Sequence, residues 1–257
     1  MSKLKGDAFE VKNEDAERLK RMLPEVEKLR AKAQSGDLEA ATALIMLLPN
    51  AYRGQKAVRF HQLWRDGRAR QEVAWQVLHD VWIHDHSRLS TEFDEDGLEI
   101  ADFMFRDLGL GSRSLPKRFR RQGRLTIWRG GTGLTAEDVD DGSSWTLNRG
   151  VACWFATRWS PAALVPSHRP YVVWREVPRK AILAYIGKRG EDEVVIDFRD
   201  LSRGDAVICD GGPGLPLDAD PSSELVESWR HAGNVWKQTK GHSSIAETVA
   251  VVSDEED

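Results

Sequence analysis

Apolar residues in the first third of the chain recur every three or four positions among charged residues, which is the spacing of amphipathic helices. The segment from Glu14 to Ala33 follows this pattern, although Pro24 is expected to kink or restart the helix. The break at Ser35-Gly36-Asp37 ends this helix and caps the following one. Further helices are expected at residues 38–48, 55–64, 70–83 and 98–108. The pattern predicts a bundle-like helical domain over residues 1–112.

After residue 124 the pattern changes to short β-prone runs that are interrupted by one helix. Such a mixture fits an α+β domain of two packed sheets, which we place at residues 113–240. Its last helix is expected to begin at Ser222 and to continue to about Lys237. Residues 241–257, which end in an acidic run, are expected to form a C-terminal tail.

Composition and charge limit the class of protein. The 257 residues are enough for two modest domains, and the formal net charge is −4. No apolar stretch is long enough to span a membrane and no signal-peptide pattern leads the chain, so we expect a cytoplasmic protein without a membrane partner. The only cysteines are Cys153 and Cys209, which excludes a disulfide framework and leaves Cys153 most simply as a buried thiol on a helix. The ten tryptophans are spread through both halves and are expected in the core.

Two clusters of potential metal ligands lack the spacing that a metal site needs. His84 and His86 lie two residues apart at an expected helix end, and no cysteine joins them. The run Asp94-Glu95-Asp96-Gly97 lacks the ligand spacing and the closing glutamate of a calcium loop. We therefore expect no metal site.

One segment departs from the acidic balance of the chain. Residues 113–124 contain six basic residues, no acidic residue and one aromatic residue, Phe119. Such a stretch can follow the backbone of RNA or DNA. It is equally compatible with a solvated linker or with a docking site for an acidic protein.

Three short segments in the second half carry the candidate chemistry. Arg129 ends an apolar run and precedes two glycines, so its guanidinium can bind a phosphate while the backbone beside it approaches a ligand closely. The hydroxyl-bearing segment Ser144-Trp145-Thr146 comes next. Glu191 and Glu193 lead into an alternating strand, where a period of two places both carboxylates on one face toward one ligand. Together the segments indicate a site for NAD.

In this order the segments resemble the arginine-serine-glutamate class of mono-ADP-ribosyltransferases, of bacterial or phage toxin or effector type. Arg129 matches the arginine of the first strand, and Ser144-Trp145-Thr146 matches the serine-threonine-serine strand. Glu191-Asp192-Glu193 matches the glutamate-x-glutamate signature. The resemblance covers residues 124–210.

The chain departs from the family pattern at Trp145, where a large indole replaces the middle hydroxyl. A rival for the first motif also exists, because Tyr52-Arg53-Gly54 has the form in which that motif is often written. It follows Leu48-Pro49-Asn50 in a helical region and no β-run precedes it. We therefore assign the first motif to Arg129.

The resemblance implies an ADP-ribosyltransferase-like, two-sheet NAD-binding domain with NAD as the substrate. Arg129 would hold the pyrophosphate, and Gly130 would offer its backbone to the nicotinamide amide. Glu193 would stabilise the oxocarbenium-like ribose as nicotinamide leaves. Ser144 and Thr146 would supply hydrogen bonds that hold Glu193 and the nucleotide.

The resemblance also directs the choice of acceptor. Retention of the first glutamate of the signature as Glu191, which would polarise or deprotonate the attacking group, favours transfer to arginine in a protein. RNA or DNA is a second acceptor class. An NAD glycohydrolase toxin and a catalytically silent binding module stay open as alternatives, and an antitoxin or regulatory protein is a possible partner.

Overall fold

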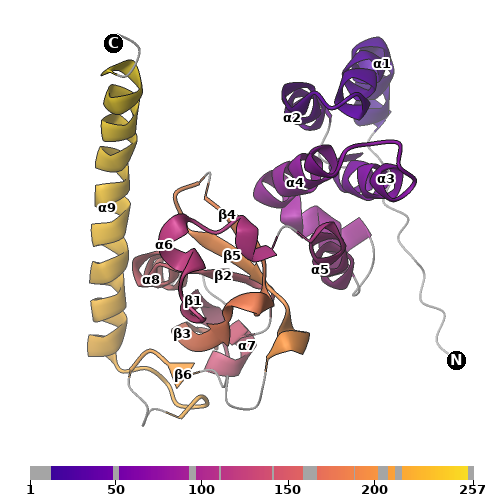
Figure 1. Cartoon of the computed structure of the whole chain (residues 1–257). Helices are drawn as coiled ribbons and strands as arrows, with labels where there is room; N and C mark the ends of the chain where they lie inside the picture. Colours follow the sequence, from indigo (N-terminus) through magenta and orange to yellow (C-terminus); the bar gives the residue numbers. More distant parts are fainter. Residues whose placement is uncertain are drawn as a thin grey trace, which may run out of the picture. The chain divides into compact units, whose positions relative to one another are not determined.

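In the computed structural model the chain divides into two compact units, Met1–Gly109 and Leu110–Asp257, which we call unit 1 and unit 2 (Figure 1). Unit 1 is helical and unit 2 contains the sheet. The structure describes residues 13–48, 52–92, 97–109, 111–140, 142–158, 167–187, 189–201, 208–211 and 216–253.

The helices of unit 1 lie where the spacing of apolar residues predicts them, except that the fourth continues to Glu92 and so contains His84 and His86 instead of ending near residue 83. They are α1 (Asn13–Gln34), α2 (Leu38–Leu47), α3 (Arg53–Arg65), α4 (Gln71–Glu92) and α5 (Gly97–Leu108). The expected restart at Pro24 does not occur, because α1 runs through this residue as one helix. Asp37 caps α2 as expected, since its carboxylate accepts a hydrogen bond from the Ala40 amide at 2.9 Å. Of the run Asp94-Glu95-Asp96-Gly97, the three acidic residues lie outside the described residues.

The interior of unit 1 is apolar apart from a few polar groups, which include the carboxylate of Asp80. Asp80 of α4 is 1% exposed, and it accepts hydrogen bonds from the Thr42 hydroxyl at 2.7 Å and from the Gln76 amide at 2.8 Å. Because a buried carboxylate is costly without such partners, these bonds fix α2 against α4. The surrounding core residues include Leu44, Ile45, Phe60, Leu63, Val77, Val81, Trp82 and Phe105.

Unit 2 is organised by one antiparallel sheet. Its strands are β1 (Arg124–Gly133), β2 (Ser144–Thr146), β3 (Arg169–Pro178), β4 (Ile182–Ile186), β5 (Glu193–Ile196) and β6 (Ile208–Cys209). They lie in the order β4-β5-β2-β1-β3-β6.

The mixture of helix and antiparallel sheet agrees with the predicted α+β class, but the expected pair of packed sheets is wrong for the described residues. All six strands belong to the same sheet. The reason lies in β1, which pairs with β2 on one edge and with β3 on the other. The ten residues of β1 thus join β2 and β3 into one sheet, whereas the short β-prone runs in the sequence suggested that the strands form two separate sheets.

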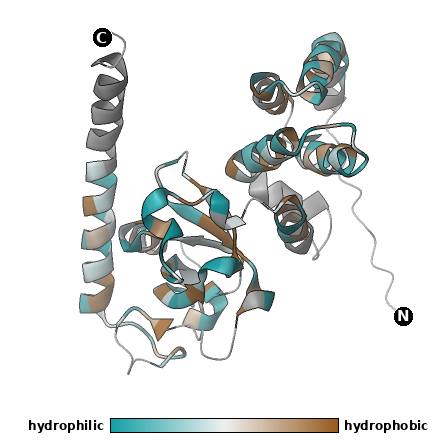
Figure 2. Cartoon of the chain, in the orientation of Figure 1, coloured by the Kyte–Doolittle hydropathy of each residue, from teal (hydrophilic) through white to brown (hydrophobic). Residues whose placement is uncertain are grey.

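The short helical segments of unit 2 lie around this sheet. They are η3 (Gly111–Arg113), α6 (Lys117–Arg120), α7 (Ala136–Asp140), α8 (Arg149–Thr157), η5 (Arg179–Ala181) and η6 (Phe198–Asp200). The basic segment of residues 113–124 therefore includes a short helix, α6. Figure 2 shows β5 largely in the hydrophobic colour, in keeping with its four buried residues.

Helix α8 packs between the sheet and α9 (Ser223–Ser253), and glycines allow both contacts. A side chain on Gly130 of β1 would overlap with the backbone carbonyl of Ala152 in α8. A side chain on Gly233 of α9 would lie 2.7 Å from the Cα of Trp154 in α8. Close backbone approach therefore holds the three elements together.

Helix α9 is longer than predicted. It continues to Ser253 and so includes most of the segment expected as a tail after residue 240, and only residues 254–257 of that segment lie outside the described residues. Ser222 precedes the helix and its hydroxyl accepts from the Leu225 amide at 3.2 Å. Trp236 of α9 lies against α8, with its ring centroid 5.7 Å from that of Trp154.

Candidate functional site

The structure brings Arg129, Ser144 and Glu193 together on neighbouring strands, where both Arg129 and Glu193 bond to Ser144. The Ser144 hydroxyl donates to Oε1 of Glu193 at 2.5 Å, and the Arg129 guanidinium donates to the main-chain carbonyl of Ser144. Arg129 lies on β1, Ser144 on β2 and Glu193 on β5, and these three strands are neighbours in the sheet. Glu193 is 6% exposed, so its partners replace the water that burial removes.

The strand alternation of β2 explains how a tryptophan is accommodated in the middle of the hydroxyl segment. Ser144 and Thr146 project toward the Glu191–Glu193 segment, whereas Trp145 projects to the opposite face. There Trp145 is 2% exposed, and its indole N–H donates to the Gly142 carbonyl at 2.9 Å. The indole therefore packs in the core and leaves both hydroxyls beside the glutamates.

Glu191 and Glu193 share a cationic partner that the sequence did not indicate. Nη2 of Arg189 donates to Oε2 of Glu193 at 2.8 Å, and its Nε lies 3.1 Å from Oε2 of Glu191. The side chains of Glu191 and Glu193 are 12% and 8% exposed and that of Arg189 is 33% exposed, so both pairs are only partly shielded from water. The two carboxylates are thus close enough to bind one guanidinium.

The two glutamates do not converge through the strand period that we expected. Strand β5 begins at Glu193, so Glu191 lies outside it. Between them Asp192 has φ +46°, in the left-handed region that is unusual for a residue other than glycine and that aspartate tolerates. A tight turn, rather than the pleat of a strand, sets the direction of Glu191.

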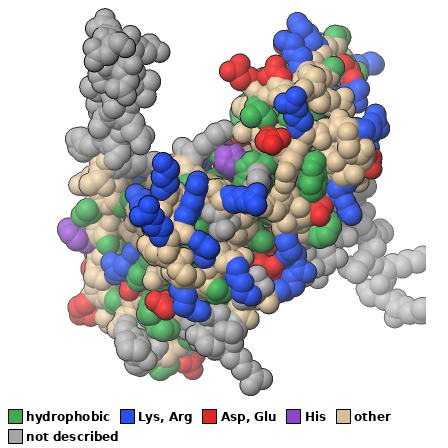
Figure 3. All heavy atoms as spheres, viewed as in Figure 1, with side chains coloured by type: hydrophobic (Ala, Val, Ile, Leu, Met, Phe, Trp, Pro, Cys, Tyr) green, Lys and Arg blue, Asp and Glu red, His purple; other side chains and the backbone are tan. Residues whose placement is uncertain are grey.

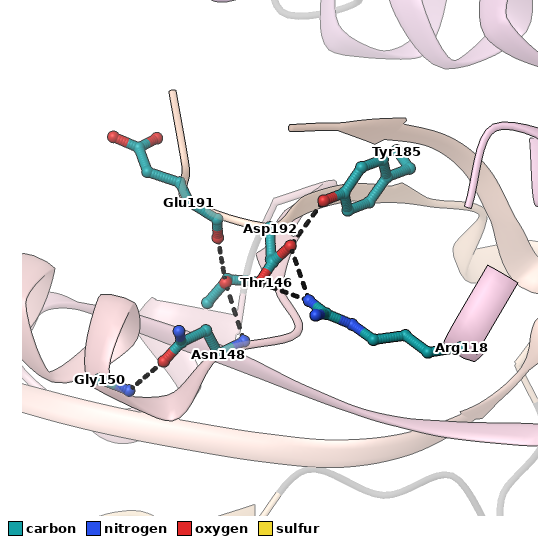
Figure 4. A network of polar contacts seen from close by, with 7 residues as sticks. All are labelled: Arg118, Thr146, Asn148, Gly150, Tyr185, Glu191 and Asp192. Atoms are coloured by element: carbon teal, nitrogen blue, oxygen red, sulfur yellow. Dashed lines mark hydrogen bonds and ion pairs between the residues drawn. The ribbon is translucent and has the colours of Figure 1, made fainter. Parts of the chain in front are cut away.

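Side chains from two other elements hold this turn (Figure 4). The Tyr185 hydroxyl donates to Oδ1 of Asp192 at 2.6 Å, and Nη2 of Arg118 lies 3.3 Å from its Oδ2. In Figure 4 the Glu191 carboxylate points away from this group. Burial, followed by the bond to Asp192, raises the pKa of Tyr185, so the phenol stays protonated and acts as a donor.

Thr146 contributes to the same turn. Its hydroxyl donates to the main-chain carbonyl of Glu191 at 2.5 Å and accepts from the Asn148 amide at 3.0 Å. The Asn148 side chain in turn accepts from the amide of Gly150 and caps α8 (Figure 4). Thr146 therefore links the glutamate turn to the start of α8.

The remaining predicted residues have structural explanations of their own. Gly130 lies on β1 directly under Ala152, so α8 already requires a glycine there. The rival residue Arg53 lies in unit 1, at the start of α3, where its Nε donates to the carbonyls of Ile45 and Leu48 at 2.9 and 3.1 Å. It thus satisfies carbonyls at the end of α2.

Sequence reasoning missed Arg189 and Arg158 as parts of this region, and it gave Asp192 no role of its own. Burial lowers the pKa of Arg158, and the attraction of the nearby Glu191 carboxylate opposes this shift without reversing it. The Arg158 guanidinium is therefore close enough to Glu191 to interact with it electrostatically. It also lies 4.6 Å above the Phe155 ring. A basic residue two positions before the first glutamate was the signal that could have identified Arg189.

Cys153 and the other candidate ligands do not add to the site. Cys153 is buried in α8 as predicted, and burial raises the pKa of its thiol to about 11, which keeps it protonated at neutral pH. Within the described ranges, no three His, Cys, Asp or Glu side chains are grouped to hold a metal ion. The helices that could be searched include none that is both long and apolar enough to cross a membrane.

Comparisons with known proteins add no assignment. No family model, curated protein or solved structure matches the chain.

Proposed function

We propose that unit 2 is an ADP-ribosyltransferase-like domain that cleaves the nicotinamide–ribose bond of NAD and transfers ADP-ribose to an acceptor. The observation that carries the proposal is that Ser144 bonds to Arg129 through its main-chain carbonyl and to Glu193 through its hydroxyl. It joins a phosphate-binding type of side chain to a buried carboxylate, and these are the two groups that the reaction needs.

The reaction assigns a separate task to each group. Arg129 holds the pyrophosphate of NAD, and the Glu193 carboxylate hydrogen-bonds the nicotinamide ribose. As the C1′–N bond breaks and nicotinamide leaves with the bonding electrons, positive charge develops on the ribose next to this carboxylate. Ser144 keeps the carboxylate in place through its 2.5 Å hydrogen bond.

Glu191 is assigned to the acceptor. A guanidinium nitrogen attacks C1′ and loses a proton to the Glu191 carboxylate, which forms the new N-glycosidic bond. The position of Arg189 supports a guanidine acceptor, because this side chain already lies against both carboxylates. Protein arginine is therefore the favoured acceptor.

A nucleic-acid acceptor is the second candidate, and one contact favours it. Arg118 of the basic helix α6 contacts Asp192, between the two glutamates, so a strand bound by α6 would pass close to the turn.

Labelled NAD separates the possibilities. Label on arginine or on RNA or DNA supports transfer to that acceptor, free ADP-ribose alone indicates an NAD glycohydrolase, and neither product indicates a silent binding module. Glu193→Gln should abolish both reactions, whereas Glu191→Gln should abolish transfer and retain hydrolysis of NAD. Glu137→Gln, on the exposed surface of α7, is the matched control and should behave as the unsubstituted protein. Equal activity of Glu193→Gln and the control contradicts the proposal.

A further inference from the structure

The fold gathers two basic segments of unit 2 into one surface. Residues 113–124 carry six basic residues, and Arg179 and Lys180 of η5 add two more. The Arg179 amide donates to the Gly123 carbonyl at 3.0 Å, and its guanidinium donates to the Arg120 carbonyl. The two segments, 55 or more residues apart in the sequence, are therefore adjacent in space, and neither contains an acidic residue.

This basic surface, defined as residues 113–124 with 179–180, is exposed, and two of its arginines, Arg118 and Arg124, are paired with Asp192 and Glu176 at its edge. The exposed residues are Arg113, Lys117, Arg118, Arg120, Arg121, Arg124, Arg179 and Lys180. In Figure 3, Lys and Arg side chains gather over the region of α6. Nε of Arg120 donates to the Leu115 carbonyl at 2.5 Å, and a bond to a neutral carbonyl orients the guanidinium without cancelling its charge.

We propose that the basic surface binds the phosphate backbone of a nucleic acid. Six of its eight cations are arginines, whose planar guanidinium binds phosphate oxygens with two parallel hydrogen bonds. Its charge also contrasts with a chain of net charge −4, so attraction of a polyanion is local to this face. The binding does not depend on the proposed transferase activity.

The same residues argue against a lipid surface as the partner. Peripheral membrane binding through a short basic segment is strengthened by apolar side chains that insert among the lipids. The large apolar residues exposed in the described part of the chain are Leu23, Leu38, Met46, Phe103, Leu134, Phe198 and Val235, all outside the basic surface. Phe119, its one aromatic residue, packs against the core of unit 2.

The test measures binding by the full chain in the absence of NAD, using fluorescence anisotropy. The probes are labelled single-stranded RNA and DNA of about 20 nucleotides, titrated between about 50 and 200 mM salt. Lys117→Glu/Arg121→Glu reverses two exposed charges of the surface. Lys28→Glu/Lys32→Glu makes the same change of net charge on exposed positions of α1 and is the matched control.

We expect binding by the unsubstituted protein and the control, and about tenfold or more weaker binding by Lys117→Glu/Arg121→Glu. Loss of two phosphate contacts should also lower the salt slope by about 1.4. The tighter of the two polymers identifies the natural strand. Equal weakening in both variants, no binding at low salt, or tighter binding of polyglutamate or anionic vesicles overturns the proposal. Because NAD is absent, none of these results depends on whether the protein is a transferase.

Discussion

The Ser144 hydroxyl and the Glu193 carboxylate form a hydrogen bond of 2.5 Å between adjacent strands of the sheet. If Glu193 stabilises the ribose cation, Ser144→Ala removes this donor and leaves the carboxylate less firmly positioned, although Arg189 still contacts its other oxygen. A hydrogen bond to a charged group contributes about 1.5–3 kcal/mol, so we expect turnover of NAD to fall about 10- to 100-fold. Steady-state release of nicotinamide measures the effect.

A serine elsewhere in unit 2 provides the control for this substitution. The Ser228 hydroxyl on α9 donates to the Leu225 carbonyl at 2.8 Å and is exposed. Ser228→Ala should therefore leave turnover unchanged. Full activity of Ser144→Ala would show that Glu193 needs no partner from β2.

The Arg189 guanidinium lies against both glutamates, where the proposed acceptor guanidinium has to bind. Arg189→Ala should therefore remove a competitor and lower the KM for a small guanidine such as agmatine. The ion pairs are partly exposed, so the expected decrease is about two- to fivefold, with kcat little changed. Initial rates at varied agmatine concentration measure both constants.

Arg199→Ala is the control for Arg189, because Arg199 is paired with Asp197 at 3.3 Å outside the glutamate turn. It should leave the KM for agmatine unchanged. A higher KM in Arg189→Ala would mean that Arg189 helps to bind the acceptor instead of competing with it.

Two glycines near β1 differ in the space around them and predict different costs of substitution. A methyl group at Gly130 would lie 2.6 Å from the carbonyl carbon of Ala152, whereas one at Gly123 has no atom of the described structure within 4 Å. Gly130→Ala should force β1 and α8 apart and lower the free energy of unfolding by about 1–3 kcal/mol or more. Gly123→Ala should change it by less than about 0.5 kcal/mol. Urea denaturation of both variants compares them, and equal midpoints would contradict this explanation of Gly130.

The sequence predicted the position of a site residue better when that residue lies on a strand than when a turn sets its direction. The apolar run before Arg129 and the position of Ser144 were sufficient to locate both residues on strands. The approach of Arg189 to Glu191 and Glu193 depends on the left-handed turn at Asp192, and no periodicity in the sequence reports such a turn. Of the partners of Asp192, Tyr185 comes from the neighbouring strand β4, whereas Arg118 lies 74 residues away in the sequence.

The extent of elements was harder to predict than their type. Helix α9 continues to Ser253, beyond Lys237, after which residues 238–244 contain no apolar side chain to suggest a helix face. The single sheet depends on β1 pairing along both of its edges, and β1 alone does not reveal its two partners. Long-range pairing of this kind depends on the whole chain, since one strand is compatible with many neighbours.

His61 of unit 1 predicts a dependence of stability on pH. It is buried between Trp64 and Phe103, with ring centroids at 5.6 and 5.8 Å, and its Nε2 lies 2.9 Å from Asp107. Burial lowers the pKa of His61, and the interaction with Asp107 opposes this without reversing it. Because the unfolded chain then binds the proton more tightly, the contribution to stability is present above a pH of about 6.5.

This contribution is lost as the pH falls from about 6.5 toward the lower pKa of the folded state. We expect the unfolding temperature, followed by far-ultraviolet circular dichroism, to fall more steeply between pH 7 and pH 5 in the unsubstituted protein than in His61→Gln. Glutamine retains a donor for Asp107 but does not titrate in this range. The exposed His231 of α9 is the control, and His231→Gln should keep the original slope. Equal slopes in all three proteins would show that the His61 proton does not contribute to folding.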